Sequence, residues 1–238
     1  MRFLREKRNL NYERYFWRWD TPEKYQLNIR AYYRMITGID HAIARVLQEL
    51  KAKGLDQNTI IVYSADNGYM RGDRRTAGKW NHYEQSLRIP LIVYDPRLPN
   101  AQRGRVVSEL VSNVDLPATF VDFGGVEIPE VYQGHSLLPL MAGDAPAGWR
   151  KDIFAEHKFY HFNNWYAVRS ERYKYASYYE ENGGPYECLY DLKKDPTELI
   201  NLAANPEYAS VLNRMKERME HYLNAYPEAV SKQHHENK

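Results

Sequence analysis

A carboxylate, an amide and an ammonium group lie close together in the sequence after one apolar segment. Asp66 and Asn67 follow the apolar run at residues 59–63, and Lys79 comes after a short polar loop. Carboxylate and amide oxygens suit Ca²⁺ or Mg²⁺, whereas a zinc site would favour histidine or cysteine. A lysine beside such a cation could neutralise the charge that builds up on an ester oxyanion during cleavage. These residue types predict metal-assisted chemistry on an anionic ester, with calcium or magnesium as the ion.

The same residues have a simpler interpretation, because Asp66, Asn67 and Gly68 together form an ordinary turn sequence. Asp, Asn and Gly tolerate left-handed backbone conformations and are common after strands. Taken alone, the tripeptide favours a turn. Its position favours a site, because open α/β sheets bind ligands beyond the carboxyl ends of their strands.

A long helix and two apolar strands are expected to position these residues. Threonine followed by proline starts a helix at residue 21, and apolar residues keep helical spacing up to residue 54. The apolar runs at residues 59–63 and 89–94 do not alternate in polarity, which predicts strands covered on both faces. With a further helix at residues 115–124, this order predicts an α/β sheet layered with helices.

The character of the sequence changes near residue 143, and we place a domain boundary there, between residues 1–143 and 144–238. The second region contains short segments rich in Tyr and Phe, which predict a small antiparallel sheet. These segments are residues 153–157, 165–169, 172–177 and 187–191. A helix from about residue 206 to residue 226 is expected to follow.

Composition and charge exclude several classes of protein. A chain of 238 residues that is 43% hydrophobic can form a globular core, and a net charge of +2 creates no field that favours nucleic acid or an anionic membrane. The one cysteine, Cys188, excludes an internal disulfide and a cysteine-rich zinc site. No segment has the roughly 20 apolar residues of a membrane span, and the first residues lack the apolar part of an export signal. We expect neither nucleic acid nor membrane as a partner, and the location in the cell stays open.

Longer motifs extend along nearly the whole chain. They are SADNG (64–68), GKW (78–80), YEQSLRIPLI (83–92), VDLPAT (114–119), GHSLLPL (134–140), LYDL (189–192) and DPTE (195–198). Together they resemble the second half of a formylglycine-dependent sulfatase, a family of the alkaline-phosphatase-like superfamily. The resemblance implies the C-terminal part of an α/β main domain, followed by a small α+β subdomain of antiparallel strands and a helix. It also implies hydrolysis of a sulfate ester, on a small molecule or a glycan, with a calcium ion.

The resemblance implies roles for particular residues. Asp66 and Asn67 match the family's second pair of metal ligands, and Lys79 matches its sulfate-contacting lysine. The family's nucleophile is a cysteine or serine oxidised to formylglycine within a Cys/Ser-x-Pro-x-Arg motif, which this sequence lacks. Cys188 does not lie in such a motif. Arg74 stands where relatives often have a histidine, which is a local departure in the substrate pocket.

These observations lead to an expectation about partners. A sulfatase would extend well upstream of Met1, so the chain is expected to need an N-terminal half or to self-associate through exposed strand edges. His82 is expected to be a packed loop residue rather than a catalytic one. His157 belongs to a polar and aromatic cluster that could either contact a sugar or pack against the main domain. The other members of this cluster are Tyr160, His161, Asn163, Asn164 and Trp165.

Two other functions remain open. A non-catalytic protein could use the remaining sulfate and sugar contacts to bind sulfated glycans. Alternatively, the substrate could differ, because phosphate and phosphonate ester hydrolases share this fold and the Asp-Asn pair.

Overall fold

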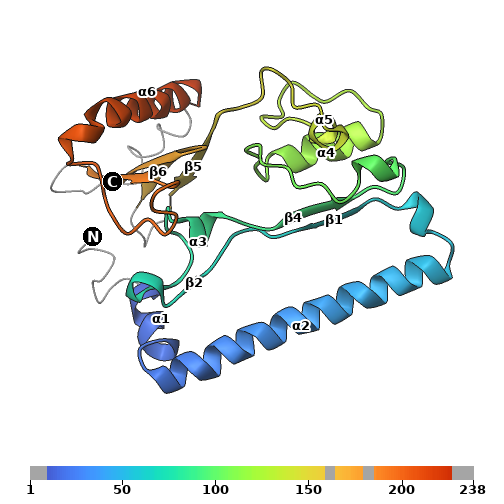
Figure 1. Ribbon diagram of the computed structural model, residues 1–238, viewed down its shortest axis with the longest axis horizontal. Coiled ribbons are helices and arrows are strands. Elements are labelled where there is room, and N and C mark those ends of the chain that lie inside the picture. Colours follow the sequence, from blue (N-terminus) through green and yellow to red (C-terminus); the bar gives the residue numbers. More distant parts are fainter. Residues whose placement is uncertain (1–9, 159–163, 179–184, 227–238) are drawn as a thin grey trace, which may run out of the picture. The chain divides into compact units, whose positions relative to one another are not determined.

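The structure of the protein, a computed structural model, describes residues 10–158, 164–178 and 185–226 (Figure 1). The chain divides into two compact units, Met1–Val106 and Val107–Lys238, and each is described by itself. The domain boundary expected at residues 143 and 144 stays a prediction.

The first unit begins with two helices, α1 (Leu10–Arg18) and α2 (Pro22–Ala52). The start predicted for α2 is confirmed, because the Thr21 hydroxyl accepts a hydrogen bond from the backbone N–H of Lys24. The 31 residues of α2 correspond to a length of about 46 Å. No helix among the described residues is apolar enough along its length to cross a lipid bilayer.

One face of α2 carries an apolar stripe that the described residues leave exposed. The most exposed members of this α2 stripe are Met35, Ile36, Ile39, Val46 and Leu47. The main contacts of α2 are with α1 and with a 3₁₀ turn at Asp56–Asn58 (Figure 1). The amphipathic pattern of the helix is therefore present without a layer that covers its apolar side.

Two short antiparallel ribbons follow α2. Strand β1 (Ile61–Ser64) pairs with β4 (Leu91–Tyr94), and β2 (Met70–Arg71) pairs with β3 (Ala77–Gly78). The short helix α3 (Glu84–Leu87) lies between β3 and β4 in the sequence.

The prediction that both apolar strands are covered on both faces is wrong for the described residues. Burial alternates along β4, and the side chain of Ile92 is 62% exposed. The physical reason is that no helix of the described residues packs closely on the ribbon of β1 and β4, so one layer of its side chains has no covering element.

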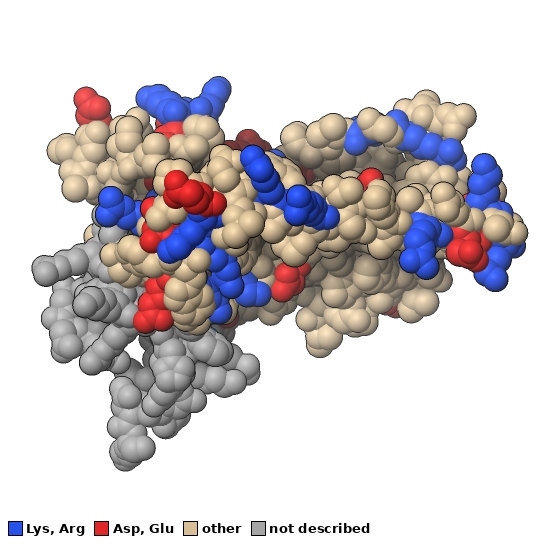
Figure 2. All heavy atoms as spheres, turned by 90° about the horizontal axis from the view of Figure 1, so that it is seen from below, with Lys and Arg blue, Asp and Glu red and all other residues tan. Residues whose placement is uncertain are grey.

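Charged side chains are dispersed on the face of the molecule that Figure 2 shows. Lys and Arg are scattered among Asp and Glu over a largely uncharged surface. This distribution agrees with the small net charge of +2, and the expectation that nucleic acid is not a partner stays a prediction.

The second unit begins with α4 (Asp115–Phe123) and α5 (Leu138–Ala142). The helix predicted at residues 115–124 is confirmed. Asp115 is fully buried; its carboxylate accepts hydrogen bonds from the backbone of Ser112 and His135 and pairs with Arg150 at 2.5 Å. This carboxylate therefore fastens the start of α4 to two later parts of the chain.

A four-stranded antiparallel sheet and a helix complete the second unit. The strands are β5 (Asp152–His157), β6 (Trp165–Ser170), β7 (Tyr173–Tyr178) and β8 (Tyr186–Asp191), paired in sequence order. After a 3₁₀ turn at Pro206–Tyr208 comes α6 (Ala209–Ala225). The small antiparallel sheet and the final helix predicted from the sequence are confirmed.

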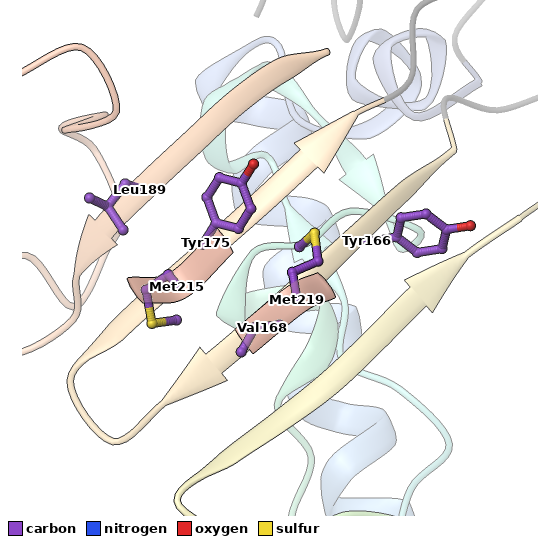
Figure 3. Close-up of a cluster of buried hydrophobic side chains, with 6 residues drawn as sticks. All are labelled: Tyr166, Val168, Tyr175, Leu189, Met215 and Met219. Atoms are coloured by element: carbon purple, nitrogen blue, oxygen red, sulfur yellow. The ribbon is translucent and has the colours of Figure 1, made fainter. Parts of the chain in front are cut away.

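Helix α6 packs against this sheet and forms the main core of the unit. Figure 3 shows the buried side chains from β6, β7, β8 and α6 that meet there. They are Tyr166, Val168, Tyr175, Leu189, Met215 and Met219. Their burial explains why the aromatic segments form strands, since alternate residues of each strand need one apolar face to pack against.

A buried ion pair connects β7 to the loop after β8. The side chains of Lys174 and Glu198 are both 0% exposed, and Lys174 Nζ lies 2.5 Å from Glu198 Oε1. Asn201 adds a second connection, because its side chain accepts a hydrogen bond from the backbone of Leu189 and donates one to Glu187. The loop is therefore fastened to both β7 and β8.

Candidate functional site

The three groups that the sequence singled out meet in the first unit. Asp66 and Asn67 follow the end of β1 at Ser64, and Lys79 follows β3. Lys79 Nζ donates a hydrogen bond to Asn67 Oδ1 at 2.5 Å and lies 3.5 Å from Asp66 Oδ2. The geometry brings the groups together, while their roles as metal ligands and sulfate contact stay predictions.

The loop after Asn67 is held by a close approach of two backbones. The Gly68 N–H donates to Ser86 O in α3 at 2.8 Å, and a Cβ on Gly68 would lie only 2.2 Å from Gln85 O. Only glycine fits such a contact. The amide of Asn67 donates to Gly68 O at 2.7 Å, so its Oδ1 is turned toward Lys79.

Helix α1 fixes the backbone on the other side of the site. The side chain of Asn11, 2% exposed, donates a hydrogen bond to Lys79 O at 2.5 Å. Gly78 has a φ of 121°, and a Cβ there would lie 2.4 Å from Asn11 Oδ1. The carbonyl of Lys79 is thus held from α1, while its ammonium group contacts Asp66 and Asn67.

The role of α1 was not foreseen from the sequence. Its face toward the site carries polar residues, Asn11, Arg14 and Arg18, spaced as one side of a helix. A search for apolar periodicity passes over such a face. The only available signal was the spacing of these three polar residues within an aromatic segment.

The exposure of the ion pair indicates that it does not serve stability. The side chain of Asp66 is 82% exposed and that of Lys79 is 35% exposed. Exposed ion pairs contribute little to folding, typically about 0–1 kcal/mol. Both groups are therefore accessible to a ligand.

The oxygen atoms of Asp66 and Asn67 suit a hard cation, but they are only part of the ligand set that such a cation needs. One oxygen of Asp66 and one of Asn67 already face the same positive charge, that of Lys79, so both can face one cation. Calcium takes six to eight oxygen ligands. Among the residues that the structure describes, no group of three or more His, Cys, Asp or Glu could hold a metal. Asp66 and Asn67 would supply two of the required ligands.

The structure also places the histidine and cysteine that the sequence analysis set aside. His82 is fully buried, with its ring 4.2 Å from that of Tyr83, which confirms that it is a packed residue. Cys188 lies in β8 and is 0% exposed, and burial raises the pKa of its thiol to about 12. A protonated, buried thiol is not a nucleophile at neutral pH.

Two further residues from the sequence analysis lie outside the contacts around Lys79. Arg74 has a φ of 55°, and its guanidinium lies 3.9 Å from the centre of the Tyr83 ring. His157 ends β5 in the second unit, where its ring stacks on that of Trp165 at 5.9 Å. The proposed sugar contact of His157 stays a prediction. Of the same cluster, Tyr160, His161 and Asn163 lie outside the described residues.

Two family profiles match the chain. The profile described as "Sulfatase" covers residues 9–126, and "N-sulphoglucosamine sulphohydrolase, C-terminal" covers residues 72–225.

Curated proteins are similar over most of the chain. N-acetylglucosamine-6-O-sulfatase of Bacteroides thetaiotaomicron is 34% identical over 85% of the chain and 37% of its own length. An arylsulfatase of Clostridium perfringens is 36% identical over 78% of the chain and 38% of its own length. The chain therefore spans less than two fifths of the length of these two relatives.

Solved structures share the fold. A protein described in complex with its substrate, D-glucosamine-2-N,6-O-disulfate, superposes with a TM-score of 0.81 at 33% identity, over 89% of this chain and 43% of that one. The phosphonate monoester hydrolase of Agrobacterium radiobacter has a TM-score of 0.77 at 32% identity, over 86% and 42%.

Proposed function

Because the chain belongs to the sulfatase family, we propose that its protein hydrolyses a sulfate ester on a sugar or glycan, with calcium at Asp66 and Asn67. The alkaline-phosphatase-like fold of that family is also the fold of this chain. The observation that carries the proposal is the meeting of Lys79 with both oxygens, at 2.5 Å and 3.5 Å.

The substrate class in this proposal is a sulfated amino sugar. The support comes from the names of relatives, one an N-acetylglucosamine-6-O-sulfatase and one solved with a disulfated glucosamine.

The residues of this chain have separate tasks. Asp66 and Asn67 would hold the metal, which supplies positive charge that polarises the sulfate group. Lys79 would contact a sulfate oxygen through its ammonium group and stabilise the negative charge that develops there. Asn11 would position Lys79 through the bond to its carbonyl. We assign the nucleophile, a formylglycine in this proposal, to sulfatase polypeptide outside this sequence.

A calcium role predicts a large effect of Asp66→Ala. The chain, produced together with sulfatase polypeptide that corresponds to the unaligned part of the relatives, should lose about 100-fold or more of its activity on glucosamine 6-sulfate. The control is Asp40→Ala, which removes an exposed carboxylate from α2. Equal activity of wild type and Asp66→Ala would exclude the metal role of Asp66.

We further propose that sulfatase polypeptide corresponding to the unaligned part of the relatives covers the α2 stripe and the open edges of β1 and β4. Open strand edges and a long apolar stripe are the surfaces that folded proteins normally cover. The relatives are long enough to provide this layer, since the chain spans only 37% and 38% of two of them.

Co-purification would measure this association. When this chain is co-expressed with sulfatase polypeptide that corresponds to the unaligned part of the relatives, Ile39→Glu should reduce their co-purification. Arg34→Gln, which changes an exposed residue of α2 outside the α2 stripe, should not reduce it. A homo-oligomer that Ile39→Glu dissociates would instead identify a second copy as the covering layer.

A second candidate function is hydrolysis of a phosphonate ester, and one observation favours it. The phosphonate monoester hydrolase of A. radiobacter has almost the same identity and coverage as the sugar-bound relative. Matched aryl sulfate and aryl phosphonate esters separate the two functions through the ratio of their kcat/KM values. Binding of sulfated but not desulfated oligosaccharide without turnover would instead indicate a non-catalytic glycan-binding protein.

A further inference from the structure

Arg14 on α1 contacts the residues before and after the lysine of the candidate site. Its guanidinium is 5.2 Å from the centre of the Trp80 ring, and Trp80 directly follows Lys79. Arg14 Nη1 also lies 3.3 Å from the point that a Cβ on Gly78 would occupy. The guanidinium therefore lies against Gly78 and against the ring of Trp80, the two residues on either side of Lys79.

Helix α1 presents Arg14 from the same face that holds the site together. Asn11, three residues earlier, bonds Lys79 O, and Arg18, four residues later, has Nη1 3.5 Å from the Tyr69 hydroxyl. Residues three and four apart share one side of a helix. Asn11 is buried and bonded to Lys79 O, so the part of α1 that carries Arg14 is held at a fixed position relative to the backbone of Lys79.

The charge of Arg14 differs from that of Lys79 in how it is compensated. Lys79 has the carboxylate of Asp66 at 3.5 Å. Arg14 is partly buried, and its stacking on Trp80 is its one polar or charged contact among the residues that the structure describes. Glu13 is exposed and adjacent in the helix, and adjacent helical residues do not face each other. Within the described part of the chain, the positive charge of Arg14 thus has no carboxylate partner, close in sequence to the lysine that is proposed to contact the sulfate.

We propose that Arg14 binds a second anionic group of the substrate, a sulfate or carboxylate on the same sugar, while Lys79 contacts the sulfate ester that is cleaved. This inference rests on the proposed function of Lys79. A guanidinium has a planar fork of donors that matches a sulfate or carboxylate in a bidentate manner. Stacking on Trp80 holds the fork in place before the ligand arrives, which lowers the entropy lost on binding.

The inference assigns a specificity to the site. A sugar with two anionic groups gains a charged hydrogen-bonded contact that a sugar with one anionic group does not make. Such contacts to charged groups change affinity by roughly 10-fold to 100-fold. Arg14 would therefore discriminate between doubly and singly charged sugars. It would take no part in cleaving the ester bond, which is the task of the groups around Lys79.

The test compares Arg14→Gln, Arg14→Lys and the control Arg34→Gln in the whole gene product. The probes are glucosamine 2-N,6-O-disulfate, glucosamine 6-sulfate and a sulfated uronic acid. In Arg14→Gln, kcat/KM for the disulfate should fall roughly 10-fold to 100-fold more than for the monosulfate. Arg14→Lys should recover part of this difference, because it keeps the charge and loses the fork. Arg34→Gln, exposed on α2, should leave both values unchanged.

Dissociation constants of the same sugars distinguish this inference from the proposed function. A wild type that cleaves no sulfate ester, yet binds the disulfate more tightly than Arg14→Gln does, would refute the hydrolase proposal and support the second anion site. An active wild type with equal affinity for singly and doubly charged sugars would refute the second anion site alone. Equal losses on both sugars in Arg14→Gln would also refute it, since they would mean that Arg14 only supports the loop. Preference for the uronic acid over the disulfate would identify the second anion as a carboxylate.

Discussion

Replacing Lys79 by alanine should lower kcat on a sulfated amino sugar roughly 10²-fold to 10³-fold, the usual effect of removing one group that stabilises transition-state charge. Its ammonium group lies at the point where the oxygens of Asp66 and Asn67 converge. The unfolding temperature should hardly change, because Lys79 and Asp66 are both accessible to solvent. Steady-state kinetics together with thermal unfolding would measure both quantities.

Two further variants make this result specific. Lys51→Ala removes an exposed lysine near the end of α2 and should keep full activity. Lys79→Arg retains the positive charge and should keep part of the wild-type activity. If Lys79→Ala retained wild-type kcat, Lys79 would have no role in the chemical step, however well it fits the geometry.

Replacing Lys174 by methionine should have the largest effect on stability, a loss of roughly 3–5 kcal/mol. The variant leaves the carboxylate of Glu198 in a site where both side chains are 0% exposed. A buried charge without its partner is far more costly than the pair. The second unit should therefore unfold at a lower urea concentration, which circular dichroism would measure.

A double variant separates the charge effect from lost packing. Combining Lys174→Met with Glu198→Gln removes the isolated charge and should recover much of the loss. Lys193→Met, which changes an exposed lysine, is the matched control. A double variant no more stable than Lys174→Met would mean that the shape of the lysine, rather than the ion pair, stabilises the loop.

Elements with strong local signals were predictable from the sequence. Helix α2 has a threonine cap, a proline in its first turn and a long apolar period, and all of these act within one or two turns. The four aromatic segments are short and separated by polar residues, which was enough to predict a small antiparallel sheet. Both predictions depend only on neighbouring residues.

Features that depend on distant residues were not predictable in the same way. A lysine in a strand is normally expected at the surface, so the burial of Lys174 could be recognised only once Glu198 was placed against it. The exposed side of β4 was misjudged because its apolar run does not tell how many layers are present.

The candidate site was predictable in part for the same reason. Asp66 and Asn67 are adjacent, and Lys79 follows after a short loop. A single reversal of the chain is therefore enough to bring the three side chains together. Asn11 lies 68 residues from Lys79, and the bond between them depends on how α1 packs. No local rule relates two such positions, so Asn11 and Arg14 could be found only in three dimensions.

The contact between Asp115 and Arg150 has a consequence for how related genes can recombine. A crossover between them would combine the carboxylate from one parent with the guanidinium position from another. Because Asp115 has no access to water, a chimaera with an uncharged residue at position 150 would inherit an uncompensated charge in its interior. Viable exchanges should therefore take Asp115 and Arg150 from the same parent, together with the residues between them.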